Sequence, residues 1–362
     1  MCVKPLKGWC VGLNPETGKK KIMITDWSVD HVEKLSTGSW ISVKEFENMS
    51  DGLVSKPSPE DVSSLAVSIV RDYITIPCGH CIECLKARGQ EWTNRCLLEY
   101  EYAKQSSYFV SLTYRDEDLP FTYYDDPETG EAFPAYTLSK THMQLFLKRL
   151  RKHFFGNEKG TLRYYLAGEY GPTTLRPHYH LLLFDVPFAD LVPTPHPNYF
   201  VSQLLDRLWP YGFHQISPME PDCIAYTCHY VTAKLNTDNY DLYDEHNMER
   251  PFALMSRRPS IGRRYFDEHP ELFEDLLSNP DPQIYLTTSQ GGIKMSLPSY
   301  FWYLYEKEGG NVEFVKDFRQ ARMKDKLSAQ LADTDLNYTA ILDARERNQM
   351  FKYSNLLRRD VL

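Results

Sequence analysis

The segment LRYYLAGEYG, residues 162–171, and the segment HYHLLLF, residues 178–184, decide the fold. Each is rich in aromatic and branched apolar residues and has the length of a strand. A short loop that contains Gly171 and Pro172 joins them, and a connection that short makes the two strands antiparallel neighbours. The sequence therefore predicts an antiparallel hairpin within a central sheet.

The segments around this hairpin alternate between strand and helix patterns. YFVSLTY, residues 108–114, alternates as a strand does. Ser139 is a suitable N-cap for a helix whose apolar residues recur every three or four positions. Further expected elements are a helix at 201–208, a strand at 214–217 and a helix opened by Pro221 and capped by Asp222. This order predicts an α+β fold with a central antiparallel sheet and helices on one face.

The rest of the chain is expected to form separate segments around this sheet. Residues 1–75 combine short strand patterns with Pro, Gly and Ser, which indicates an accessory N-terminal lobe. Residues 76–106 contain a cysteine knuckle followed by a helix, and residues 107–240 contain the sheet. Residues 241–362 form a C-terminal extension that ends in a charged helical stretch.

Composition excludes several classes of protein. A chain of 362 residues has room for two domains, or for one large domain with extensions. Its 42% hydrophobic and 25% charged residues are typical of a globular protein and argue against disorder and coiled coils. Its apolar runs fall far short of the ~18 residues of a membrane span, and MCVKPLKGWC at the start lacks a secretory pattern. We expect no membrane association and a reducing, cytosolic compartment.

The charge balance argues mildly against a nucleic-acid partner. The formal net charge is −8, whereas proteins that neutralise phosphates usually carry a basic footprint. Two local patches qualify this, and each is either a phosphate-binding track or simply a solvated face. The candidate residues are Arg149 and Lys152 on the helix after Ser139, and Arg257, Arg258, Arg263 and Arg264.

Two histidines of the hairpin are placed to bind a metal ion. His178 and His180 are two apart, so both side chains leave the same face of the strand. Glu169 lies near the end of the preceding strand, and the hairpin brings it beside them. Two imidazoles and one carboxylate suit a divalent ion with open positions. The alternative is a pair of hydrogen-bonded histidines in a sheet with a surface glutamate.

A later helical segment presents two tyrosines. Tyr226, Tyr230 and Lys234 recur at every fourth position of DCIAYTCHYVTAKL, residues 222–235, and fall on one side of a helix. Tyrosine is a competent covalent nucleophile once its developing charge is stabilised. The alternative is that both tyrosines are half-buried packing residues.

Eight cysteines in an intracellular chain indicate thiols or metal ligands more than disulfides. Cys78, Cys81 and Cys84 form C-x2-C-x2-C, and Cys96 follows twelve residues later. This set predicts a structural zinc site, in which His80 could replace one thiol. An iron–sulfur centre or free buried thiols are the alternatives. The remaining cysteines are read as structural: Cys2, Cys10, Cys223 and Cys228.

Several of these motifs, taken in order, resemble one family. YFVSLTY, then GEY with RPHYHLLLF, then YTCHYVTAK are similar to the HUH superfamily of rolling-circle replication initiators, named for histidines that flank a hydrophobic residue. More closely, the chain resembles the replication initiation proteins of gokushovirus-type microviruses, which are small single-stranded DNA phages. Other matching stretches are MCVKPL, PCGHCIECLKARGQEWTNRCLLE, MSRRPSIG at 255–262 and GGIKMSLPSYF at 291–301.

The resemblance implies an endonuclease that nicks and rejoins DNA, with residues 107–240 as its nicking domain. It implies that His178, His180 and Glu169 hold Mg²⁺ or Mn²⁺ against the scissile phosphate. Tyr226 and Tyr230 would be paired nucleophiles, each able to form a 5′-phosphotyrosine and leave a free 3′-hydroxyl. Lys234 would stabilise charge or orient the reacting groups.

The same resemblance implies partners and a location. Single-stranded origin DNA would be the substrate, with a host helicase and polymerase as further partners, in the host bacterial cytoplasm. The basic patches and the C-terminal extension would then contact DNA backbone. Two alternatives stay open: a non-catalytic module whose sheet binds single-stranded nucleic acid, and a transposase or relaxase with the same chemistry.

Overall fold

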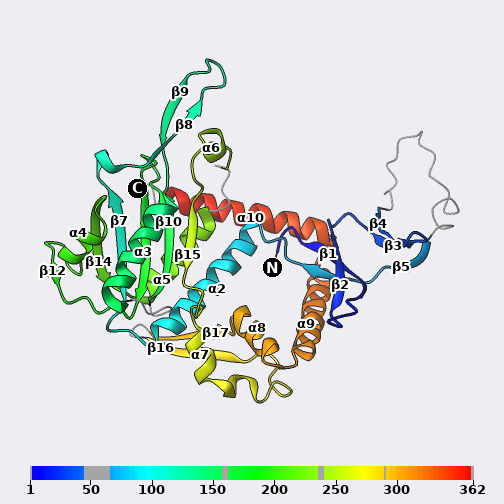
Figure 1. The fold of residues 1–362 in the computed structure, drawn as a ribbon. Coiled ribbons are helices and arrows are strands. Elements are labelled where there is room, and N and C mark those ends of the chain that lie inside the picture. Colours follow the sequence, from blue (N-terminus) through cyan, green and yellow to red (C-terminus); the bar gives the residue numbers. More distant parts are fainter. Residues whose placement is uncertain (1, 45–65, 157–161, 235–239, 289–290, 360–362) are drawn as a thin grey trace. The chain divides into compact units, whose positions relative to one another are not determined.

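A computed structural model of the chain describes residues 2–44, 66–156, 162–234, 240–288 and 291–359 (Figure 1). The side chains of residues 230–241 and 352–359 lie outside this description. The chain divides into two compact units, a smaller one from residues 1–84 and 320–359 and a larger one from residues 85–319. The four-part division expected from the sequence stays a prediction.

The larger unit is built on a seven-stranded antiparallel sheet with the order β12-β13-β14-β7-β11-β10-β15 (Figure 1). Its strands are β7 (Tyr108–Tyr114), β10 (Arg163–Tyr170), β11 (Pro177–Phe184), β12 (Leu191–Pro193), β13 (Phe200–Ser202), β14 (Gly212–Pro218) and β15 (Phe252–Met255). The expected hairpin is β10 and β11, and β11 also pairs with β7. The predicted α+β class with a central antiparallel sheet is confirmed.

Helices cover both faces of this sheet. On one face, Tyr179, Leu181 and Leu183 of β11 join a core with α3 (Lys140–Phe155) and α4 (Gln203–Leu208). On the other, Leu182 and Phe184 pack with α2 (Ile82–Tyr100) and α5 (Pro221–Lys234). The sequence had placed helices over one face only. The second layer is needed because Leu181–Phe184 are consecutive apolar residues, so β11 presents apolar side chains to both faces.

Two helix starts follow local sequence signals. Ser139 caps α3 as expected, since its hydroxyl accepts a hydrogen bond from the backbone N–H of His142 at 3.2 Å. Helix α5 begins at Pro221, so Asp222 lies in the first turn and not at the cap. This shift follows from proline, which is favoured at the first helical position because it has no N–H to satisfy.

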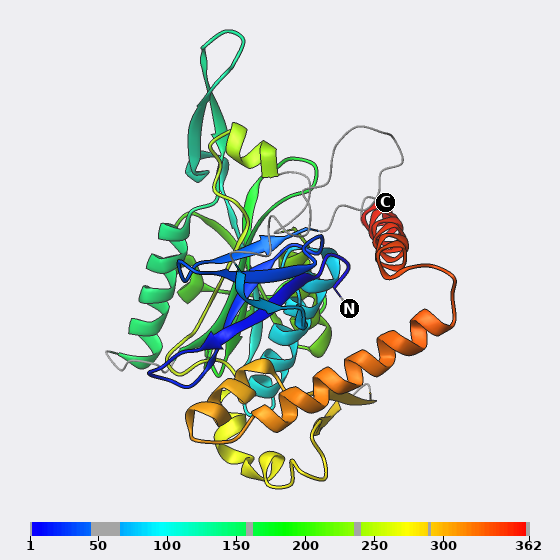
Figure 2. The ribbon, with the colours of Figure 1, turned by 90° about the vertical axis from the view of Figure 1, so that its right-hand side faces the viewer.

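The larger unit carries two peripheral hairpins and several short helices. The hairpin of β8 (Phe121–Asp125) and β9 (Ala132–Tyr136) projects beyond the sheet in both views (Figures 1 and 2). The other elements are β16 (Gln283–Thr288), β17 (Gly291–Ser296), α6 (Tyr240–Glu245), α7 (Arg263–Glu268), α8 (Ser299–Lys307) and the 3-10 turns Asp116–Asp118 and Pro270–Phe273. No described helix has both the length and the apolar character that crossing a bilayer requires.

The smaller unit contains two three-stranded sheets, as the short strand patterns predicted, with the orders β2-β1-β6 and β4-β3-β5. Their strands are β1 (Leu6–Leu13), β2 (Lys20–Thr25), β3 (His31–Leu35), β4 (Trp40–Val43), β5 (Ala66–Val70) and β6 (Tyr73–Ile76). The charged C-terminal stretch forms α9 (Glu313–Ala332) and α10 (Tyr338–Arg359). Trp9, Val29 and Val32 form the buried hydrophobic cluster of this unit.

Candidate active site

The strand register brings Glu169, His178 and His180 together on the face of the sheet that α5 covers. Glu169 pairs directly with His178 across the β10–β11 hairpin, and His180 leaves the same face two residues on. One carboxylate oxygen of Glu169, Oε1, lies 2.8 Å from Nε2 of His178 and 3.0 Å from Nε2 of His180. The potential ligand atoms of the three residues all lie within 4.8 Å of one another.

Neighbouring groups fix the orientation of both imidazoles. Nδ1 of His178 lies 3.2 Å from the carbonyl oxygen of Arg176, and Nδ1 of His180 lies 3.0 Å from the hydroxyl of Ser111. The ring of Phe109 stacks on His180 at a centroid distance of 5.3 Å. These contacts turn both Nε2 atoms toward Glu169, as the outer partners of metal-binding histidines do.

Sequence reasoning missed Ser111 and Phe109, although a signal was present. Both lie on β7, which pairs with β11 so that Ser111 faces His180 and Phe109 faces Leu182. Alternate residues of YFVSLTY therefore share the face of the histidines. The order of the strands in the sheet, which local patterns do not give, was the missing step.

The donor and acceptor pattern at His178 fits a cation. Its two ring nitrogens face oxygen acceptors, the Arg176 carbonyl and the Glu169 carboxylate. A neutral imidazole has only one N–H to offer, so this arrangement needs either a second proton or a cation in place of that proton. Two imidazoles and a carboxylate are ligands that divalent transition ions and Mg²⁺-type sites use.

Glu169 is held in its ionised form. Burial raises the pKa of this carboxyl, but the hydrogen bonds and charges of His178 and His180 lower it further, to about 2. The side chain is only 2% exposed. The sheet thus presents a carboxylate at every pH near neutrality.

Helix α5 lies over this cluster because its apolar side is anchored in the core. Ile224 and Cys228 are fully buried and pack with Tyr165 and Leu182 of the sheet. The opposite side carries Tyr226, which is 47% exposed. The ring of Tyr226 lies 6.0 Å from the ring of His180, with an interplanar angle of 78°. The structure therefore brings Tyr226 together with the three potential ligands.

The backbone of α5 includes Tyr230 and Lys234, one and two turns beyond Tyr226. Their side chains lie outside the described residues. Their expected roles stay predictions.

The predicted basic residues separate into three groups. Arg149 and Lys152 lie on α3, across the sheet from the histidines, and Arg149 donates to the carbonyl of Leu208 at 2.7 Å. Arg257 and Arg258 are exposed just after β15. The last pair is engaged in ion pairs: Arg263 with Asp267 and Glu308, and Arg264 with Glu268.

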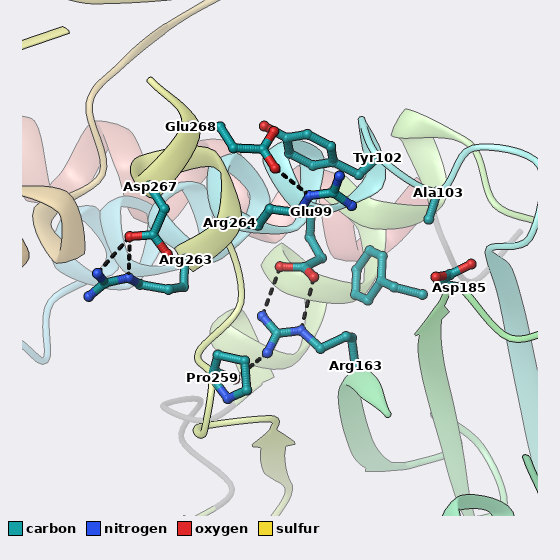
Figure 3. Close-up of a pocket in the computed structure, with 11 residues that line it drawn as sticks. Glu99, Tyr102, Ala103, Arg163, Asp185, Pro259, Arg263, Arg264, Asp267 and Glu268 are labelled. Atoms are coloured by element: carbon teal, nitrogen blue, oxygen red, sulfur yellow. Dashed lines mark hydrogen bonds and ion pairs between the residues drawn. The ribbon is translucent and has the colours of Figure 1, made fainter. Parts of the chain in front are cut away.

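A pocket of about 390 Å³ lies among these last arginines (Figure 3). It is distant from the histidines, because its Arg163 begins β10 six residues before Glu169, roughly 20 Å along a strand. Arg163 makes a two-pronged pair with Glu99 of α2 at 2.9 and 3.0 Å. The polar groups drawn in Figure 3 mainly satisfy one another, which indicates a structural role.

The expected zinc set is not brought together as a whole. Cys96 is fully buried in the larger unit, with its sulfur 4.0 Å from that of Cys228. It lies twelve residues beyond Cys84 on the same helix, which is roughly 18 Å at 1.5 Å per residue. Cys78, Cys81 and Cys84 do converge, and Cys2 joins them. His80 is exposed and is not part of this group.

Comparison with known proteins bears on residues 107–235, which match the family model of replication-associated proteins of the ORF2 type. The chain resembles phage replication-associated proteins. The Replication-associated protein ORF2 of Spiroplasma virus 4 is 27% identical over 298 residues, which cover 80% of this chain and 85% of that protein. The Replication-associated protein VP4 of Bdellovibrio phage phiMH2K is 26% identical, over 58% of this chain and 63% of that protein.

A third relative is the Replication-associated protein ORF4 of Chlamydia phage 1, 26% identical over 44% of this chain and 38% of that protein. The expected likeness to the replication proteins of microviruses is thereby confirmed. No solved structure matches the chain. The segment matched by the replication-associated family runs from β7 to α5, and so contains the histidines, Glu169 and the tyrosine helix.

Proposed function

We propose that this chain initiates phage DNA replication by nicking and rejoining single-stranded origin DNA through a tyrosine. The likeness to replication-associated proteins supports a role in replication initiation. The observation that carries the nicking chemistry is the position of Tyr226 beside His180, where a nucleophilic side chain adjoins a candidate metal-binding cluster.

Glu169, His178 and His180 would hold Mg²⁺ or Mn²⁺, which supplies a Lewis acid for a phosphate oxygen. Their own contribution is to present one anionic and two neutral ligands from a rigid hairpin. Ser111 and the Arg176 carbonyl keep the two imidazoles turned inward. Phe109 covers one face of His180 and limits the rotation of its ring.

Tyr226 would act as the nucleophile. Its phenolic oxygen, after loss of its proton, forms a bond to phosphorus while the bond from phosphorus to the 3′ oxygen breaks. The 3′ oxygen takes up a proton and becomes a free hydroxyl, and the 5′ end stays attached to Tyr226. Rejoining is the reverse transfer, in which a 3′-hydroxyl attacks the phosphotyrosine.

Tyr230 would supply a second nucleophile from the same helix, one turn further on. Two nucleophiles on one helix allow a second cleavage while the first product is still attached. Lys234 would contribute positive charge near the reacting phosphate. Arg257 and Arg258 are the exposed cations proposed to contact the DNA backbone.

The test is covalent capture on the intact chain. Labelled single-stranded oligonucleotides that tile the phage genome are incubated with the protein and Mn²⁺, and adducts that survive denaturant are digested and mapped. The proposal predicts an adduct at Tyr226 or Tyr230 that chelation abolishes. Binding without any adduct on all oligonucleotides would support a non-catalytic module instead, and an adduct elsewhere would refute the assignment.

A further inference from the structure

A cluster of four cysteine thiols lies in the smaller unit, outside the proposed nicking site. It comprises Cys2, Cys78, Cys81 and Cys84, whose sulfur atoms all lie within 4.8 Å of one another. The sulfurs of Cys2 and Cys81 are 3.7 Å apart, and those of Cys78 and Cys84 are 4.0 Å apart. These distances are far longer than the ~2.05 Å of a disulfide, so the four residues are thiols.

The spacing of the sulfurs matches one particular ligand. Four sulfurs placed ~2.3 Å from a tetrahedral zinc ion lie ~3.8 Å from one another. We propose that Cys2, Cys78, Cys81 and Cys84 form a structural zinc site that holds the segment before β1 against the start of α2. This set replaces Cys96, which the sequence spacing had favoured, by Cys2.

The topology explains why Cys2 is the fourth member. Strands β1 and β6 are antiparallel, and Leu6 pairs with Ile76 at one end of their ladder. The chain that leads into β1 and the chain that leaves β6 therefore meet at the same end of the sheet. Cys2 and Cys78 lie on these two segments, each within a few residues of the ladder.

The local backbone is arranged as in a metal-binding knuckle. The N–H of Cys78 donates to the sulfur of Cys2 at 3.3 Å, and the N–H of Cys81 donates to the sulfur of Cys78 at 3.3 Å. Such hydrogen bonds stabilise thiolates, the form that binds zinc. Gly79 adopts a positive φ of 82° between these two cysteines, a conformation that glycine permits at little cost.

The smaller unit has a physical need for such a link. Its hydrophobic cluster contains three fully buried residues, Trp9, Val29 and Val32. A core of that size supplies little stability, and small units of this kind are commonly stabilised by a structural metal ion. Zinc binding would add directly to the free energy of folding of this unit.

The experiment measures zinc in the full-length protein by mass spectrometry and compares single cysteine variants. Cys2→Ala and Cys81→Ala should each lose about one zinc per chain. Cys96→Ala and Cys10→Ala should keep it, the first as a buried thiol of the larger unit and the second as an exposed thiol. His178→Ala should also keep it, which separates this ion from one bound at the nicking site.

A second measurement does not depend on whether the variants fold. In the wild-type protein, alkylation of Cys2, Cys78, Cys81 and Cys84 should be at least about tenfold slower than alkylation of Cys10 until a chelator is added. Alkylation of Cys2 at the rate of Cys10 in the zinc-loaded protein would overturn the proposal. Loss of zinc from Cys96→Ala but not from Cys2→Ala, or iron with labile sulfide in place of zinc, would overturn it as well.

Discussion

The ring of Tyr226 on α5 lies edge-on to the ring of His180 on β11, with centroids 6.0 Å apart. One residue comes from a helix and the other from the central hairpin, so their approach depends on how α5 packs on the sheet. Ile224 and Cys228 provide that packing. The contact between a phenol and a candidate ligand is therefore built into the core of the larger unit.

Tyr226→Phe should remove covalent attachment at this position without weakening the fold. The side chain is 47% exposed, so loss of its hydroxyl should change the free energy of unfolding by no more than about 0.5 kcal/mol. Binding of Mn²⁺ should be unchanged. The matched control is Tyr303→Phe, since Tyr303 is also an exposed helical tyrosine. Adduct mapping and chemical denaturation check both parts, and an undiminished yield of adduct in Tyr226→Phe would show that another residue is the nucleophile.

Glu169→Gln should weaken Mn²⁺ binding by about tenfold or more, because the amide keeps the shape of the carboxylate but removes its charge. Isothermal titration of the full chain measures this directly. Glu117→Gln is the control, since Glu117 is an exposed acid outside the cluster. Equal affinities for the two variants would show that Glu169 is not a ligand.

Gly89→Ala should displace the tyrosine helix. A Cβ at Gly89 of α2 would lie 2.7 Å from Nδ1 and 3.2 Å from Cα of His229 on α5. Relief of that overlap should cost about 1–3 kcal/mol of stability, although alanine favours a helix by about 1 kcal/mol over glycine. Adduct formation should fall as α5 shifts. Arg88→Ala, an exposed neighbour on α2, should leave both properties unchanged. Adding His229→Ala to Gly89→Ala should restore part of the loss.

Arg257→Ala with Arg258→Ala should weaken binding to single-stranded DNA at all sequences. Each lost phosphate contact lowers the salt dependence of log affinity by ~0.7 on single strands, so the pair should lower it by about 1.4. Arg263 and Arg264 are engaged with carboxylates, and the corresponding double variant should change the slope less. Fluorescence titrations at several salt concentrations distinguish the two pairs.

Asp190→Asn should reveal a pH-dependent contribution to stability at the start of α4. Burial raises the pKa of Asp190, but hydrogen bonds from the N–H of Leu204 and the hydroxyl of Ser202 lower it below the ordinary value. A lowered pKa means that the contribution is present above the unfolded-state pKa and is lost as pH falls through the folded-state value.

The wild-type protein should therefore exceed Asp190→Asn in free energy of unfolding by on the order of 1 kcal/mol at pH 7. The difference should shrink below about pH 4. Denaturation curves across this range measure it, with Asp126→Asn on an exposed turn as a comparison. A difference that grows on acidification would contradict the expected sign.

Local patterns were sufficient to predict much of the larger unit. The strand 108–114 is β7, and the hairpin of β10 and β11 follows from two apolar strands and a short loop. That register alone places Glu169 opposite His178. The second helical layer was missed because a run such as Leu181–Phe184 shows that both faces are buried but not which helices bury them.

The fourth cysteine could not be predicted from spacing. Cys2 meets Cys78 only because β1 pairs with β6, and the two residues are far apart in the chain. Spacing instead favoured Cys96, which the rise of α2 carries away from Cys84. Long-range strand pairing decides such sites, and one sequence gives little information about it.

Strand β11 is hydrogen-bonded to a neighbour on each edge, β7 on one and β10 on the other. Its backbone amides should exchange with solvent only when the whole sheet opens, which makes them among the most slowly exchanging in the larger unit. Tyr226, by contrast, projects from a helix that rests on the sheet through side chains. Any adjustment between successive phosphoryl transfers would therefore fall to that helix, while the imidazoles stay in place as a fixed reference.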